Sequence, residues 1–256
     1  MAQPSSGGIK IESRKDLEAW LQDKPHAVAQ AITTRAALRV LPLICGDSVE
    51  PIRGGYPKSG LLFGAFRCLF LPSVTMLGDV TESIKKAAHS AAAASIQAPA
   101  FSNTPDAAAA AARSAANSLA SYVSCASNAT YNSYYAVTDP ADRISILAAV
   151  EVDCRQFDAG KSVADVMRSP IWSKPTPDWV RAAWRATTGN KSLRIARFAP
   201  WFKWYEGIAG LYDGSTCDIF GPDLSLKIAL QPDDWWKRGV EAVNADVIRW
   251  LAEKEG

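Results

Sequence analysis

Alanine makes up half of the residues between positions 87 and 120, with 17 alanines in 34 residues and six in succession at 107–112. Alanine has the highest helix propensity of all residues, so this stretch strongly limits the folds open to the chain. Only Pro99 and the sequence Asn103-Thr104-Pro105 oppose a helix here. We therefore expect two helices separated by this break, the second beginning near Asp106, where a negative charge suits the helix dipole. A disordered linker is the alternative.

The rest of the sequence also indicates helices. No segment alternates apolar and polar residues between turn signals, as a half-buried strand would. Apolar residues recur at helical spacing, for example at Val28 and Ile32. Ser13 and the Asp139-Pro140 pair mark helix starts, and we expect Ile144 to lie in the core of the second of these helices. The prediction is a mostly α fold, a multi-helix bundle with an alanine-rich central helical region.

The 256 residues suffice for one large domain or two small ones. We expect a flexible N-terminus at 1–12, a helical domain with the alanine-rich centre at 13–169, and a Trp-rich helical module at 170–256. This module contains eight of the nine tryptophans: Trp172, Trp179, Trp184, Trp201, Trp204, Trp235, Trp236 and Trp250.

The tryptophans of the module are expected to fill its own small core. We place Trp204 and Trp236 in that core. Trp235, adjacent to Trp236 and therefore on another side of its helix, is expected to stay exposed and to anchor a partner, because exposed tryptophans are common at binding hot spots.

Charge is nearly balanced overall but divided locally. The 28 Lys and Arg against 26 Asp and Glu argue against a dedicated nucleic-acid coat protein. The 48% hydrophobic and 21% charged residues exclude global disorder. Residues 174–203 hold seven basic residues and one acid, whereas 206–234 hold six acids and one base. Either these two segments face each other over an aromatic core, or the basic segment binds a partner. The candidate partner-binding cations are Arg181, Arg185, Arg194, Arg197 and Lys203, with Lys191 added if the partner is nucleic acid.

A catalytic or metal-binding constellation is not apparent. His26 and His89 lack metal-ligand spacing to other ligating residues. The sequence RQFDAGKS at 155–162 ends like a phosphate-binding loop, but Arg155 stands where its first glycine belongs. We predict no catalytic residue, no cofactor and no metal ligand. A dispersed site combining Cys154, Asp153 and a distant histidine is the remaining enzymatic possibility.

The cysteines and the apolar segments indicate a cytoplasmic protein. The five cysteines are odd in number and never form a CxxC pair, as is typical of reduced intracellular thiols. The first fourteen residues lack the apolar region of a secretory signal. The most apolar run, at 61–77, contains Arg67 and is shorter than the about 20 residues that span a membrane. It is predicted to be a buried core helix.

Several motifs together resemble a group of uncharacterised bacterial proteins. They are SRKDLEAWL near the start, the alanine-rich centre, WFKWYEGIAG at 201–210 and the closing ALQPDDWWKRGVEAVNADVIRWL. The resemblance covers most of the chain. It is clearest at Trp201, Trp204, Tyr205, Trp236, Gly239, Val243, Asn244 and Ala245. Gly207-Ile208-Ala209 depart from the pattern of the group. The resemblance implies a bacterial, intracellular, helical protein, and it carries over no functional residue.

These observations favour a non-enzymatic helical protein that binds other proteins, as an adaptor or accessory subunit of a bacterial assembly. An enzyme or toxin-like effector with a dispersed site is one alternative. A nucleic-acid-binding module using the basic 174–203 segment is the other, and it would show strongly salt-dependent binding.

Overall fold

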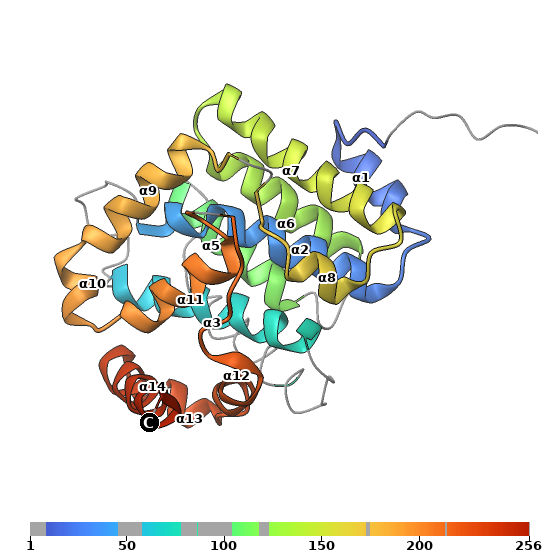
Figure 1. The fold of residues 1–256 in the computed structure, drawn as a ribbon. Helices are drawn as coiled ribbons and strands as arrows, with labels where there is room; N and C mark the ends of the chain where they lie inside the picture. Colours follow the sequence, from blue (N-terminus) through green and yellow to red (C-terminus); the bar gives the residue numbers. More distant parts are fainter. Residues whose placement is uncertain are drawn as a thin grey trace, which may run out of the picture.

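The computed structural model describes residues 9–45, 58–77, 86, 104–117, 123–172, 175–212 and 214–255. Within these ranges every regular element is a helix, thirteen of them α-helices and one a 3-10 helix, and there is no strand (Figure 1). This confirms the prediction of a mostly α, multi-helix fold.

The helices before residue 170 are α1 (Arg14–Leu21), α2 (His26–Val40), the 3-10 helix η1 (Leu41–Cys45), α3 (Lys58–Leu77), α5 (Thr104–Asn117), α6 (Val123–Ala136), α7 (Pro140–Asp158) and α8 (Val163–Met167). Those after it are α9 (Asp178–Gly189), α10 (Lys191–Ile195), α11 (Ala199–Ala209), α12 (Gly221–Ala229), α13 (Asp233–Trp236) and α14 (Val240–Glu255).

Helix starts follow local signals in the sequence. Ser13 and Asp16 form a reciprocal capping box at α1, in which each side chain accepts a hydrogen bond from the backbone N–H of the other residue. The Asp139 side chain caps α7, with proline at the first helical position. Ser162, the last residue of the GKS sequence, forms a second capping box with Asp165 at α8. The GKS sequence therefore connects two helices and does not form a phosphate-binding loop.

The alanine-rich region is helical where it is described. The predicted second helix is α5, and it begins at Thr104, two residues before the expected start. Six of its alanines, Ala108, Ala110, Ala111, Ala112, Ala115 and Ala116, are buried, and α5 contacts α2, α3 and α6, where small side chains allow close packing. The predicted first helix, over residues 87–98, lies outside the described residues.

Helix α2 runs through the middle of the bundle and contacts α3, α5, α6, α7 and α8 (Figure 1). Thirteen of its fifteen residues are buried, from Val28 to Val40. Two of the thirteen are arginines, Arg35 and Arg39, which need polar partners in such a position.

Two stretches of helix are long and apolar enough to cross a membrane, at His26–Ile44 and Ser59–Met76. Most of their residues are buried inside the protein. The second stretch coincides with the apolar run predicted to be a core helix.

The largest hydrophobic cluster joins the Trp-rich region to α3. Phe66 and Phe70 of α3 each lie with their ring centroids within about 6 Å of the rings of Trp201 and Trp204 of α11. Trp204 and Trp236 are buried, as predicted. The division of the chain at residue 170 stays a prediction, but the core extends across it, and the tryptophans pack on α3 instead of only on one another.

Three expectations about burial need correction. Trp235 is only 7% exposed, because its ring stacks on Trp250 and its indole N–H donates to Asp246 at 2.9 Å. Ile144 is 65% exposed, because the buried face of α7 runs through Ile146 and Val150 instead. Ile11, within the segment expected to be flexible, is buried in a second, smaller cluster with Leu17 and Leu21 of α1.

Candidate functional site

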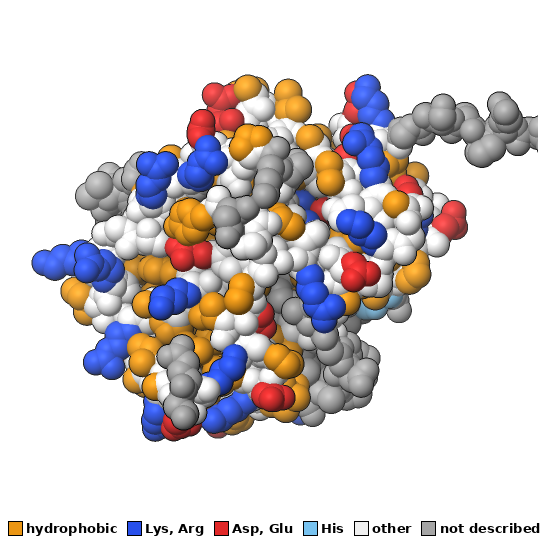
Figure 2. Space-filling model, in the orientation of Figure 1, with side chains coloured by type: hydrophobic (Ala, Val, Ile, Leu, Met, Phe, Trp, Pro, Cys, Tyr) orange, Lys and Arg blue, Asp and Glu red, His pale blue; other side chains and the backbone are white. Residues whose placement is uncertain are grey.

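Exposed cations gather on three consecutive helices, α9, α10 and α11. We call five of them the basic edge: Arg185, Lys191, Arg194, Arg197 and Lys203. Figure 2 shows lysine and arginine side chains over these helices. Arg181 is half-buried and pairs with Asp178 of its own helix. Because this ion pair offsets its charge, we do not count it in the basic edge.

The five cations of the basic edge form no ion pair with any described residue. The neighbouring acidic segment is engaged elsewhere: Asp233 pairs with Arg67, and Asp234 lies 3.5 Å from Lys237. Glu206 accepts hydrogen bonds from the Trp184 indole at 2.9 Å and from the Tyr212 hydroxyl at 3.1 Å. The described acids of the acidic segment therefore form no ion pair with the basic edge, and the aromatic residues form a core.

Hydrogen bonds connect the helices that carry the basic edge to the core. The Asn190 side chain caps α10 by accepting from the N–H of Ser192 at 3.0 Å. Beneath α10, buried Asn244 of α14 donates to the carbonyl of Ala196 at 2.6 Å and accepts from the Trp201 indole at 2.8 Å. This network connects α10, α11 and α14, because each partner of Asn244 belongs to a different segment. It thereby connects helices from which the exposed cations extend.

Ile195 is the exposed apolar residue of this surface. It ends α10 between Arg194 and Arg197, and 67% of it is exposed. Phe198, Trp201, Phe202 and Trp204 point inward and are buried. Ile195 thus offers a partner an aliphatic contact beside positive charge, and the accessible aromatic rings of this region are the partly exposed Trp179 and Tyr212, which is 72% exposed.

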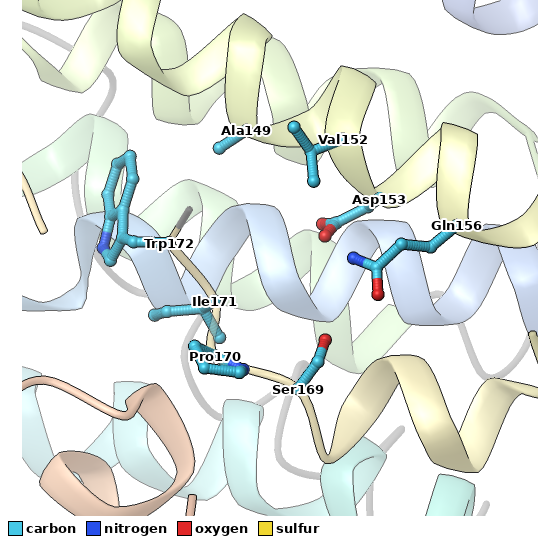
Figure 3. A pocket seen from close by; sticks show the side chains of 8 residues that line it. All are labelled: Ala149, Val152, Asp153, Gln156, Ser169, Pro170, Ile171 and Trp172. Atoms are coloured by element: carbon cyan, nitrogen blue, oxygen red, sulfur yellow. The ribbon is translucent and has the colours of Figure 1, made fainter. Parts of the chain in front are cut away.

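A second site lies where α7 faces the segment that follows α8. It is a pocket of about 250 Å³ lined by Asp153, Gln156, Ser169, Trp172 and four apolar residues, Ala149, Val152, Pro170 and Ile171 (Figure 3). Asp153 points toward it from α7 and is 1% exposed.

Two arginines of α2 hold the Asp153 carboxylate. Arg35 Nη2 lies 2.9 Å from Oδ1, and Arg39 Nη2 lies 2.6 Å from Oδ2. The guanidinium groups also donate to backbone carbonyls of 166–171 and of Ala149. Burial lowers the pKa of Arg39, and the negative charge of Asp153 opposes this effect. Asp153, Arg35 and Arg39 thus connect α2, α7 and the 166–171 segment. We assign this buried cluster a structural role.

Cys154, the thiol of the dispersed catalytic site considered from the sequence, is buried in the interior. Burial, together with the negative charge of Asp153, raises the pKa of the Cys154 thiol far above neutrality. A nucleophilic cysteine needs the opposite shift. His26, at the start of α2, is half-buried, and His89 lies outside the described residues. Among the residues that the structure describes, no group of three His, Cys, Asp or Glu could hold a metal ion.

Sequence reasoning missed Arg35 and Arg39 as the partners of Asp153. A signal was present, since the two arginines are the charged residues of this helix and lie four residues apart, thus on one face. Their acidic partner is more than a hundred residues away along the chain, and nothing near α2 indicates it.

Comparisons with protein-family models, curated proteins and solved structures found no match to this chain. The resemblance to a bacterial group therefore stays a prediction.

Proposed function

We propose that this chain is a non-enzymatic helical interaction protein whose basic edge binds an acidic surface of a partner protein. The observation that carries the proposal is the set of five exposed cations that lack ion pairs within the described structure, two of which, Arg194 and Arg197, flank the exposed Ile195 in the sequence. Complementary charge steers association and selects partners, and the aliphatic side chain adds apolar contact.

A protein partner fits this surface better than nucleic acid. Binding of single strands relies on aromatic side chains on which bases stack. Phe198, Trp201, Phe202 and Trp204, the aromatics next to Arg197 and Lys203 in the sequence, are buried in the core and offer no such platform. The exposed side chain among the cations is aliphatic, which suits an apolar side chain of another protein.

An enzymatic function has less support. Burial raises the pKa of the Cys154 thiol, and the Asp153 carboxylate pairs with two guanidinium groups, which does not favour either as nucleophile or base. We propose no cofactor.

The proposed setting is the bacterial cytoplasm, where the chain would act as an adaptor or accessory subunit of an assembly. Cys154 and Cys217 are free thiols, which is compatible with a reducing compartment.

The test is to select ligands for the full chain from an unbiased library of displayed random peptides. We expect the selected peptides to be rich in Asp and Glu flanking an aliphatic residue. Reversing three cations (R185E, R194E and K203E) should weaken the binding of these peptides by about 10-fold to 100-fold in fluorescence anisotropy at low salt, and added salt should reduce the difference.

The matched control reverses three exposed cations on or beside α1 and α8, at the opposite end of the molecule from α10 (K15E, K161E and R168E). It changes the net charge equally and should leave binding nearly unchanged. Selected peptides without an acidic excess, or equal losses in both triple variants, would contradict the proposal. Tighter binding of a 20-nucleotide single strand than of any selected peptide, lost in the first triple variant, would favour the nucleic-acid alternative.

A further inference from the structure

Arg197 has a backbone conformation that L-residues rarely adopt. Its φ is +59°, and among the described residues it is the only non-glycine with positive φ. The left-handed region brings Cβ too close to the following carbonyl oxygen, which makes it unfavourable for every residue except glycine.

Three helices of the described part of the chain, α7, α10 and α11, end with the same pair of backbone hydrogen bonds. The first and last of them have glycine at the position that Arg197 takes in α10. At the end of α7, Gly160 N–H donates to Phe157 O at 2.9 Å and Lys161 N–H donates to Gln156 O at 3.1 Å. At the end of α11, Gly210 and Leu211 make the equivalent bonds to Gly207 and Glu206, each at 3.2 Å. Both endings are Schellman motifs with glycine at the left-handed position.

The third ending is that of α10, where arginine takes the position of the glycine. Arg197 N–H donates to Arg194 O at 3.1 Å, and Phe198 N–H donates to Leu193 O at 3.3 Å. These bonds use only backbone atoms, so glycine would make them equally well and without the strain. The motif therefore gives no reason for an arginine at this position.

The Arg197 side chain gives no structural reason either. It is exposed, and its guanidinium makes no hydrogen bond or ion pair with any described residue. The two backbone hydrogen bonds of the motif hold the unfavourable conformation, and no hydrogen bond or ion pair of the side chain with a described residue adds to them. Strained residues of this kind cluster at binding sites, where the strain fixes the direction of a side chain.

We infer that Arg197 is the specificity-determining residue of the basic edge, and that its guanidinium takes a carboxylate of an acidic protein segment whose aliphatic side chain covers Ile195. This inference rests on the proposed function and deepens it by naming the central contact and the chemistry of the partner. A guanidinium presents a planar fork that binds a carboxylate through two parallel hydrogen bonds, which a lysine cannot do. Ile195, two residues earlier at the end of α10, supplies the apolar contact beside it.

The test compares R197G, R197K and R194A in the full chain, with the acidic peptides selected above as ligands. R197G should raise Tm by about 2 °C, because it relieves the left-handed strain. The same variant should weaken peptide binding at least about tenfold, because a charge-assisted pair is lost. A gain in stability together with a loss of binding is the result that a merely structural residue would not produce.

The other two variants separate charge from geometry. R197K keeps the charge and the strain but not the fork, so it should leave Tm unchanged and still weaken binding severalfold. R194A removes a neighbouring exposed cation from a helical position, and it should weaken binding less than R197G does.

The outcomes distinguish this inference from the proposed function. If R197G binds as the wild type does while the R185E/R194E/K203E variant loses binding, the basic edge is the interface but Arg197 is not its determinant. If neither variant loses binding, both proposals fail. A lower Tm of R197G would also overturn the inference, since the side chain would then stabilise the fold itself.

Discussion

Replacing Asp153 by asparagine should lower the free energy of unfolding by about 3–5 kcal/mol. The variant keeps the size of the side chain but leaves Arg35 and Arg39 without their shared counter-charge in the interior. Removing one partner of a buried ion pair is strongly destabilising because an uncompensated buried charge remains. The change is measured by urea denaturation followed by circular dichroism.

Asp158 provides a matched control on the same helix. It pairs with Lys24 at 2.7 Å, and both side chains are partly exposed. Because water and salt screen such a pair, Asp158→Asn should cost no more than about 1 kcal/mol. Equal effects of the two asparagine substitutions would contradict the structural role assigned to the buried cluster.

Replacing Trp204 by alanine should lower the free energy of unfolding by about 3–5 kcal/mol, since a large buried aromatic leaves a cavity between α3 and α11. The whole chain should unfold in one transition at a lower urea concentration. The reason is that Trp204 packs on Phe66 and Phe70 of α3 and thus belongs to a core shared by both parts of the chain.

Trp20→Ala is the control, because Trp20 is only partly buried beside the smaller cluster. It should cost clearly less than Trp204→Ala. The shared core would be contradicted if Trp204→Ala unfolded residues 170–256 in a separate, earlier transition while the signals of α2 and α5 persisted. Hydrogen exchange resolved along the chain would reveal such a transition.

The basic edge shows how far local sequence leads toward a function. The cations and their segment could be identified from charge counting alone. Their freedom from ion pairs could not, because it depends on where the acids of 206–234 find their own partners, such as Arg67 for Asp233. Nor did the sequence indicate the left-handed conformation of Arg197, because arginine is not a residue that marks such a turn.

The sequence by itself determined the class of fold and many helix boundaries. Helix propensity, capping and proline act over one to four residues, so Ser13, Asp139 and the alanines of α5 specify their helices without distant partners. The burial of Trp204 and Trp236 followed from their size and apolar character.

Only the tertiary structure decided which polar groups and which faces are buried. Trp235 is buried because Trp250 and Asp246 of α14 cover it, and no residue of its own short helix indicated that contact. Asp153 became a structural residue because folding brings Arg35 and Arg39 to it across more than a hundred residues. Contacts between groups so distant in the chain depend on how whole helices pack, and no local pattern of residues encodes that packing.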